Sequence, residues 1–409
     1  MPAGRKAREA WIPRPGHEVK LLEGSSAYFA ALVAAIDGAA RQVLLETYIF
    51  DFTGGAAEVA YALERAARRG VAVRVVVDGF GTAPLPATWR ERFLDAGVDW
   101  HEYEPLGRWG LLWPGSWRRL HQKLCVVDET VAFCGGINIL DDFHDPNHGR
   151  LDSPRLDFAV QVRGPLVAHA HATMARQWLR MKAATQMRHA RLAGALQSYR
   201  AWRIAARSPA AAPRTASRSR AALLLRDNLR NRARIERAYY RAIGHAREEI
   251  IIANAYFVPG AKMRRALISA ARRGVRVRLL VQGRYEYFMQ YYASRPVYGA
   301  LLRAGVEIHE YAASFLHAKV AVVDGHWATV GSSNLDPLSL LLAREANVVV
   351  EDREFAAQLA ARLHEAMAKE GRAMDADEYA RRPLHERIME RLALGIMRVL
   401  LMIQGQKYL

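Results

Sequence analysis

A histidine and a lysine near residue 317 have the types and spacing that suit phosphate chemistry. His317 and Lys319 lie in the stretch LHAKVAVVDGHWATVGSSNLD, which predicts a strand, an Asp-Gly turn, a second strand and a small polar loop. Side chains two positions apart on a strand leave the same face, so an imidazole and an ammonium would stand together. The loop adds Ser332 and Asn334, whose polar groups can bind phosphoryl oxygens. The stretch therefore predicts a phosphate site at the end of a strand.

The same pattern occurs a second time, in LHQKLCVVDETVAFCGGIN at residues 120–138. The corresponding pairs, always 196 positions apart, are His121 with His317, Lys123 with Lys319, Asp128 with Asp324, and Asn138 with Asn334. One His-x-Lys is also the pattern of a surface strand with two polar residues facing water. Two complete copies are much harder to obtain by chance, so we interpret them as a duplicated functional unit. The copies differ at Gly136, where the second has Ser332.

The elements around both motifs also repeat. Strands are expected at residues 43–50, 71–77 and 98–103 with helices at 58–69 and 89–96, and again at 250–257, 275–281 and 306–311 with a helix at 261–273. Such alternation predicts an α/β fold with parallel neighbouring strands and functional residues at their carboxyl ends. We predict two repeats, at residues 1–180 and 223–370, most simply related by approximate two-fold symmetry. A basic linker at 181–222 and an amphipathic tail at 371–409 complete the expected organisation.

Composition limits the partners. The chain has 409 residues and a formal net charge of +18, which indicates an anionic partner, either nucleic acid or an anionic membrane. Its two cysteines, Cys125 and Cys134, have no CxxC spacing and align with small core residues of the other copy, so no zinc site is expected. No signal peptide and no apolar run of membrane-spanning length is recognisable, which predicts a soluble or peripheral protein.

Three segments have compositions that suit an anionic membrane surface. Residues 106–119 combine three tryptophans with arginines, as at a water–lipid interface, or form an ordinary packed loop. Residues 388–403 are apolar but interrupted by Arg391 and Arg398, so they either lie flat on a bilayer or cover the core. Residues 180–220 contain no acidic residue and form either a solvated linker or a contact with an anionic surface.

Two histidines can divide the displacement at a phosphodiester between them. One attacks phosphorus and holds the phosphoryl group covalently, while the other protonates the leaving alkoxide and then deprotonates the incoming nucleophile. The charge that builds on the non-bridging oxygens would be stabilised by Lys123, Lys319, Asn138, Asn334 and Ser332.

Four carboxylates have less specific signals. Asp157 and Glu345 each follow a motif at the head of an apolar strand, and are candidates for the acceptor that fixes a histidine tautomer. A salt bridge to a neighbouring arginine is the alternative for both. Asp128 and Asp324 fall at hairpin turns, where they close the turn or pair with a lysine.

The motif H-x-K-x4-D-x6-G-[GS]-x-N, present twice, resembles the signature of the phospholipase D superfamily. The stretches LLETYIF, IIANAYFVPG and HWATVGSSNLDPLSL further resemble the cardiolipin synthase B group of that superfamily. This resemblance implies two repeats of mixed sheets flanked by helices, one shared active site, a phosphohistidine intermediate, and no metal or other cofactor. The family roles fall on His121, Lys123, Asp128, His317, Lys319 and Asp324, with His121 as nucleophile and His317 as acid and base.

The reaction implied by this resemblance is transfer of a phosphatidyl group from one phosphatidylglycerol to another, giving cardiolipin and glycerol. It places a peripheral protein at the cytoplasmic side of a bacterial cell membrane. A phospholipase D-type hydrolase, a nuclease and a catalytically idle binding protein are the alternatives. The Trp-rich segment and the apolar tail suit lipid better than base stacking, so nucleic acid is not the expected partner.

Overall fold

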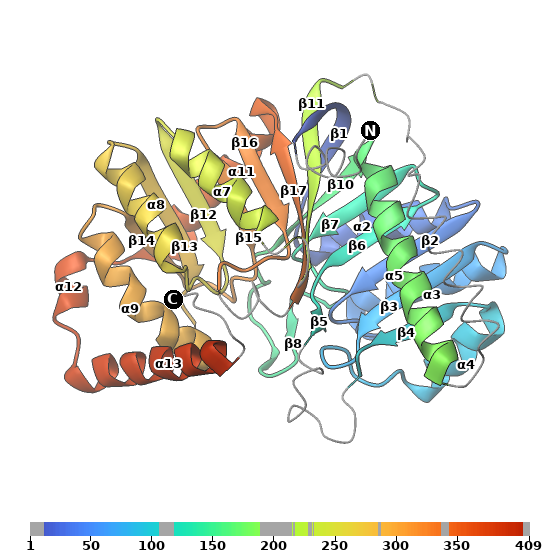
Figure 1. The fold of residues 1–409 in the computed structure, drawn as a ribbon. Helices are drawn as coiled ribbons and strands as arrows, with labels where there is room; N and C mark the ends of the chain where they lie inside the picture. The colour runs from blue at the N-terminus through green and yellow to red at the C-terminus, as the bar shows by residue number, and fades with distance from the viewer. Residues whose placement is uncertain are drawn as a thin grey trace. The chain divides into compact units, whose positions relative to one another are not determined.

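The computed structural model describes residues 12–105, 118–188, 215, 217–227, 231, 233–284, 288–336 and 343–403. Most of the Trp-rich segment and most of the predicted basic linker lie outside these residues. The chain divides into two compact units, Met1–Asp141 with Ala159–Leu223, and Asp142–Phe158 with Leu224–Leu409 (Figure 1). The predicted domain boundaries stay a prediction. The units differ from them in that residues 142–158, which follow the first motif, belong to the second unit.

The first unit is a mixed sheet covered by helices on both faces. Its strands lie in the order β1-β10-β7-β6-β2-β3-β4, and β11 pairs with β1. The strands are β1 (Arg14–Glu23), β2 (Gln42–Thr47), β3 (Ala72–Asp78), β4 (Asp99–Tyr103), β6 (Lys123–Val127), β7 (Val131–Gly135), β10 (Phe158–Arg163) and β11 (Ser219–Arg226). The helices are α2 (Gly24–Asp37), α3 (Gly54–Arg68), α4 (Ala87–Ala96) and α5 (Leu166–Arg188).

Alternating burial along β3 explains the two helical layers. Val75 and Val77 join the large apolar cluster that also contains buried residues of α2, α3 and α4. Val76 points to the opposite face, where it packs with Leu120 and with Trp178 of α5. Because both faces are covered, the central strands β2 and β3 are mostly apolar; they overlap the strands predicted at residues 43–50 and 71–77.

The second unit repeats this architecture. Its strand order β14-β13-β12-β15-β16-β17 matches β4-β3-β2-β6-β7-β10, with β18 added at the edge. The strands are β12 (Glu249–Asn254), β13 (Arg276–Gln282), β14 (Glu307–Tyr311), β15 (Lys319–Val323), β16 (Trp327–Gly331), β17 (Ala343–Glu351) and β18 (Gly371–Ala373). The helices are α7 (Arg234–His245), α8 (Ala261–Arg272), α9 (Phe288–Leu302), α11 (Arg353–Glu365), α12 (Ala376–Ala380) and α13 (Leu384–Ile403). The predicted α/β repeats are thereby confirmed.

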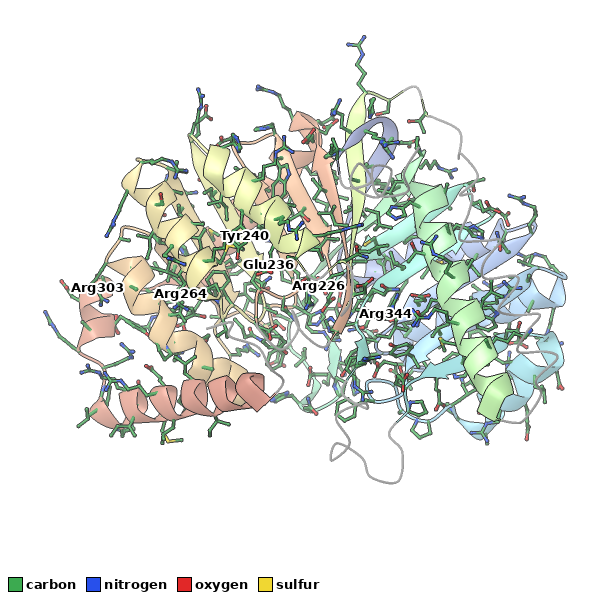
Figure 2. All side chains as sticks on the ribbon, viewed as in Figure 1. Arg226, Glu236, Tyr240, Arg264, Arg303 and Arg344 are labelled. Atoms are coloured by element: carbon green, nitrogen blue, oxygen red, sulfur yellow. The ribbon has the colours of Figure 1, made fainter. Side chains whose placement is uncertain are left out.

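Strands β2, β3 and β4 of the first unit are parallel to one another, and so are β12, β13 and β14 of the second. The motif hairpins, β6–β7 and β15–β16, are antiparallel. Leu45 of β2 pairs with Val75 of the parallel β3 and with Cys125 of the antiparallel β6. In the second unit α11 packs against β12, β15, β16 and β17, and α7 packs against α8. Tyr240 and Glu236 both lie on α7 (Figure 2), and the Tyr240 hydroxyl donates to Glu236 at 3.4 Å. Lys262 Nζ of α8 lies 4.6 Å from the Tyr240 ring centroid.

Asp128 and Asp324 fasten the motif hairpins to the start of the neighbouring strand. The Asp128 carboxylate accepts the backbone N–H groups of residues 40, 41 and 42, at 2.7, 2.8 and 2.8 Å. The Asp324 carboxylate accepts those of residues 247, 248 and 249, at 2.9, 2.9 and 3.0 Å. Both aspartates have positive φ, 50° and 48°, in the tight turn after the first strand of the hairpin. Their hydrogen bonds hold the register between the hairpin and β2 or β12.

These bonds also shift the acidity of Asp128. Partial burial alone would raise the pKa of its carboxyl. The backbone donors at Ala40, Gln42 and Arg41, with the Arg41 charge, outweigh burial and hold the pKa below its ordinary value. A depressed folded-state pKa contributes stability that is fully present above the unfolded-state pKa and is lost as pH falls through the folded-state value.

We expect Asp128→Asn and Asp324→Asn each to lower the free energy of unfolding by about 1–2 kcal/mol, because asparagine tolerates positive φ but lacks the charge and the second acceptor oxygen. Denaturant titration measures the change. For Asp128→Asn the difference from wild type should be full at neutral pH and shrink below the ordinary aspartate pKa of 3.8. Asp95→Asn, an exposed aspartate on α4, is the matched control. Unchanged stability in both hairpin variants would contradict this anchoring role.

Candidate active site

Each motif lysine is buried beneath its histidine. Lys123 is 2% exposed and Lys319 is fully buried, although lysine is among the residues least often found inside proteins. Lys123 Nζ donates to the backbone oxygen of His121 at 2.9 Å, and Lys319 Nζ donates to that of His317. Each ammonium thus fixes the backbone that carries the imidazole. A buried cation beside an imidazole also attracts an anion, because a buried charge is poorly screened.

The imidazole of His317 is held by a carboxylate. His317 Nδ1 and Asp157 Oδ2 are 2.6 Å apart; the carboxylate is 3% exposed and the imidazole 20%. Because the carboxylate only accepts, the network assigns the proton to Nδ1 and the lone pair to Nε2. Asp157 also accepts the N–H of Phe158 at 2.8 Å, which orients its carboxylate. The structure thus brings Asp157 to a motif histidine in the contact that a tautomer-fixing acceptor makes.

Residues 142–158 deliver Asp157 to that position. The backbone N–H of Leu156 donates to Phe315 at 3.1 Å, and the N–H of His317 donates to the Leu156 oxygen at 2.9 Å. The Ser314 hydroxyl donates to the Ser153 oxygen at 2.7 Å. These hydrogen bonds join residues 153–156 to residues 314–317, so the backbone bonds on either side of Leu156 place Asp157 next to His317.

The same segment carries its own ionic cluster. One oxygen of Asp145 meets His148 Nδ1 at 2.9 Å, and the other accepts from Arg155 at 3.2 Å. Burial would raise the pKa of Asp145, but the hydrogen bonds from His148 and Asn147 and the Arg155 charge hold it below its ordinary value. His148 packs on the Phe315 ring at 4.9 Å between centroids. The cluster stiffens the stretch that positions Asp157.

The loop after β16 presents Ser332 and Asn334. Both are buried, at 0% and 2% exposure, and Ser332 Oγ donates to the carboxylate of the fully buried Glu345. Ser332 Oγ also accepts the N–H of Ala346 at 3.1 Å. Gly331 is required before this loop, because a Cβ there would lie 2.2 Å from the Asn347 side chain. Glu345 is therefore placed against Ser332, and its predicted contact with a histidine stays a prediction.

The first motif has aromatic surroundings. The His121 and Tyr48 rings lie 5.0 Å apart between centroids, and Lys123 Nζ lies 5.4 Å from the Tyr48 centroid, within cation–π range. The side-chain oxygen of Asn138 accepts the N–H of Ile49 at 3.1 Å, which ties its loop to the end of β2. In the second unit the corresponding link between strand end and loop is made by Asn254 at the end of β12, whose side-chain oxygen accepts the N–H of Leu335 at 3.0 Å.

Asp78 and Gln282 were missed by sequence reasoning. They end the corresponding strands β3 and β13, and each accepts the N–H of the leucine before a motif histidine: Leu120 at 2.7 Å and Leu316 at 3.0 Å. Asp78 is fully buried. A glycine follows each of them, Gly79 or Gly283. A polar residue followed by glycine at the end of the same strand in both repeats is the sequence signal that could have identified them.

Asp128 and Asp324 lie at the far end of the strands that begin with the motif lysines. Lys123 and Asp128 are five positions apart along an extended strand, a span of about 16 Å. Their carboxylates bind backbone N–H groups there, as described above. Among the described residues, no three His, Cys, Asp or Glu side chains come together in the arrangement that holds a metal ion.

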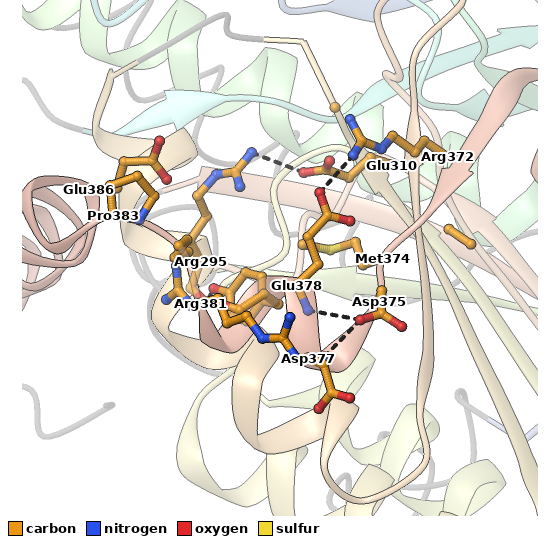
Figure 3. Close-up of a pocket in the computed structure, with 14 residues that line it drawn as sticks. Arg295, Glu310, Arg372, Met374, Asp375, Asp377, Glu378, Arg381, Pro383 and Glu386 are labelled. Atoms are coloured by element: carbon orange, nitrogen blue, oxygen red, sulfur yellow. Dashed lines mark hydrogen bonds and ion pairs between the residues drawn. The ribbon is translucent and has the colours of Figure 1, made fainter.

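A hollow of about 970 Å³ lies elsewhere in the second unit, between β14, β18 and helices α9, α12 and α13 (Figure 3). Arg295 pairs with Glu310 at 3.0 Å, and Arg372 with Glu378 at 3.0 Å. Burial raises the pKa of Glu310, although Arg295 and Arg372 oppose the shift. Four arginines face five carboxylates in the lining, and no motif residue takes part. The lining of this hollow therefore carries no excess of positive charge, and the hollow is not the site that the motif residues form.

Comparison with known proteins places the fold and motifs in a family. The model of the family described as "Cardiolipin synthase, PLD-like domain" matches residues 32–148 and 239–367, which covers both motifs. Cardiolipin synthase B of Escherichia coli K12 is 37% identical over 342 residues, covering 84% of this chain and 78% of that protein. Cardiolipin synthase A of Pseudomonas putida F1 is 32% identical over 350 residues, covering 85% and 68%.

Solved structures agree at the level of the fold. A phosphatidylserine synthase of Haemophilus influenzae superposes with a TM-score of 0.66 at 12% identity, covering 98% of each chain. The architecture and paired motifs define a phospholipase D-like protein. Within that class, the chain belongs to the cardiolipin synthase family.

We expect Asp157→Asn to lower turnover by at least about 100-fold with a native far-UV spectrum, because the amide no longer fixes the His317 tautomer as an anion does. Steady-state kinetics on the lipid substrate proposed below measure the loss. Asp152→Asn, an exposed aspartate five residues earlier, is the control and should keep wild-type turnover. A folded Asp157→Asn protein within threefold of wild type would show that the contact does not assist the reaction.

Proposed function

We propose that the protein transfers a phosphatidyl group from one phosphatidylglycerol to the hydroxyl of a second, giving cardiolipin and glycerol. The observation that supports the proposal most is the paired motif. In each copy a buried lysine donates to the backbone oxygen of the motif histidine, and Asp157 binds Nδ1 of His317. Membership of the cardiolipin synthase family supports the choice of lipid.

The proposed reaction uses both histidines on the same phosphorus. His121 attacks with its unprotonated ring nitrogen, and the bond from phosphorus to the glycerol oxygen breaks. His317 enters this step as the imidazolium, gives its Nε2 proton to that oxygen as glycerol leaves, and is left with the lone pair on Nε2. His317 then takes the proton from the hydroxyl of a second phosphatidylglycerol, whose oxygen attacks phosphorus and displaces His121. The lone pair on Nε2 of His317, set by Asp157, is the state that accepts this proton.

Lysine and loop groups stabilise the transition state in this scheme. Lys123 and Lys319 supply fixed positive charge toward the non-bridging oxygens, and Asn138, Asn334 and Ser332 supply dipoles. Glu345 stays a candidate for the acceptor that fixes the tautomer of a motif histidine, the role proposed for Asp157. Asp128 and Asp324 are proposed to act through the hairpin register, because their carboxylates bind backbone N–H groups at the far end of the motif strands.

The proposed site of action is the surface of the bacterial cell membrane, on its cytoplasmic side, with the protein bound peripherally. The formal net charge of +18 favours an anionic bilayer, and phosphatidylglycerol is an anionic lipid. Among the helices in the described part of the chain, none is both long and apolar enough to cross a bilayer. Nucleic acid is not a proposed partner.

Purified protein incubated with phosphatidylglycerol vesicles should form cardiolipin and release one glycerol for each cardiolipin. Thin-layer separation of the lipids with an enzymatic glycerol assay measures both products. Phosphatidic acid as the only lipid product would instead show a hydrolase, because water would then be the acceptor at the same site.

We expect His121→Ala and His317→Ala each to lower turnover by at least about 1000-fold, because His121 forms the covalent intermediate and His317 transfers the proton that speeds its formation and is needed for its breakdown. With labelled phosphatidylglycerol, His317→Ala should accumulate a covalent adduct and His121→Ala should not. An adduct in His121→Ala alone would exchange the two roles. His326→Ala, an exposed histidine in the second hairpin turn, is the matched control and should remain active.

A further inference from the structure

Helix α13 carries an aliphatic stripe that no other described element covers. Leu384, Ile388, Leu392 and Ile396 are 69%, 49%, 55% and 50% exposed. Their spacing of four residues places them on one face of the helix. Large apolar residues exposed singly are ordinary, but four in line along one helix form a continuous strip, which marks an interaction surface.

The opposite face of α13 is fixed to the second unit. Ala393 and Glu390 are 0% and 1% exposed, and α13 packs against α9 (Figure 1). The Glu390 carboxylate accepts from both Arg382 Nε and a terminal nitrogen of that guanidinium, at 2.8 and 2.6 Å. This bidentate ion pair ties the helix to the turn before it, where Arg382 also donates to the Tyr379 backbone oxygen at 2.6 Å and the Tyr379 hydroxyl donates to the Arg295 oxygen of α9. The stripe is therefore held outward and cannot turn into the core without breaking these contacts.

Arginines line one flank of the stripe. Arg387 and Arg391 are exposed and lie one turn apart, roughly 100° around the helix from the centre of the stripe. Exposed Arg381 precedes the helix. Within the described residues, none of these three side chains has an acidic partner, whereas the nearby Arg372 and Arg382 are paired with glutamates. The unpaired positive charge in this region is thus concentrated beside the apolar strip.

We propose that α13 is the element that docks the protein on an anionic phospholipid surface, with the stripe entering the boundary between headgroups and acyl chains and the arginines contacting lipid phosphates. An aliphatic face beside unpaired cations is the pattern of a helix lying in a membrane interface. Long arginine side chains can reach the headgroups while the helix body sits deeper. The proposal rests on the proposed function, because a phosphatidylglycerol substrate is presented at such a surface.

A protein partner fits these features less well. The strip has no aromatic residue among its four exposed members, although tryptophan, tyrosine and arginine dominate the anchors of protein interfaces. Against a second copy of this chain, a row of unpaired arginines would also face a strongly basic molecule of formal net charge +18. A bilayer containing phosphatidylglycerol supplies both an apolar interior and fixed negative charge.

The test compares Ile388→Glu/Leu392→Glu with Leu94→Glu, a control at a 77% exposed leucine on α4. Both are made in a His121→Ala background, so that turnover does not change the vesicles. Co-sedimentation with vesicles of phosphatidylglycerol and phosphatidylcholine measures binding. The stripe variant should bind at least tenfold more weakly and the control should bind like its parent. Equal binding by parent and stripe variant would overturn the proposal.

The arginines are tested separately with Arg387→Gln/Arg391→Gln. Each lost charge should weaken binding to vesicles containing phosphatidylglycerol by about fivefold at low salt, with a much smaller effect on vesicles of phosphatidylcholine alone. Added salt should narrow the gap between parent and variant, since a surface charge acts over about a Debye length. An equal loss on both kinds of vesicle would overturn the electrostatic part of the proposal.

A further measurement separates this proposal from the proposed function. With His121 restored, the stripe variant should convert a short-chain, water-dispersed phosphatidylglycerol within twofold of wild type, while it loses activity on vesicles. If wild type itself fails to convert either lipid, the proposed function fails and the binding result still decides the role of α13. A stripe variant with unchanged vesicle binding but a lower molar mass by light scattering would assign the strip to self-association and overturn the proposal.

Discussion

The hydrogen bond between Asp157 and His317 is the constraint on which the second motif depends. An imidazole can serve as base or nucleophile only when one ring nitrogen carries a lone pair directed at the reacting atom. Asp157 supplies this by binding Nδ1, and residues 142–158 bring it there through backbone bonds to the stretch before His317. This segment follows the first motif in sequence but belongs to the second unit. The chain therefore uses residues from its first half to prepare a histidine in its second.

Both repeats surround their histidine with the same kinds of support. A buried lysine binds the histidine's own backbone oxygen, a strand-end side chain binds the preceding N–H, and an aspartate fixes the hairpin turn. All of these supports are side chain to backbone bonds. The motif lysines and Asp78 are buried, where a lost partner is expensive, whereas the hairpin aspartates are partly exposed. The repeats are nevertheless unequal, since Ser332 and Glu345 pair in the second unit while Gly136 stands in the first.

Much of this architecture was readable from the sequence because it is periodic or repeated. The apolar strands, the hairpins and the two motifs leave local traces, and the repeat order of strands follows from them. What was missed depends on contacts distant in sequence. Helix α3 begins at Gly54, earlier than predicted, and the Asp141 carboxylate 86 residues later accepts the N–H of Gly55 at 3.3 Å. The roles of Asp78 and Gln282 were missed for the same reason. For the tail, the sequence allowed either a flat membrane helix or a cover for the core; α13 packs one face and exposes the other.

The central claim is that the two motifs act on a single phosphoryl group. Calorimetric titration with orthovanadate, a phosphate-like ion, tests it without relying on turnover. The account predicts one ion bound per chain, and loss of that binding in His121→Ala and in His317→Ala alike. Two ions per chain, with one remaining in each single variant, would show two separate sites and contradict the account.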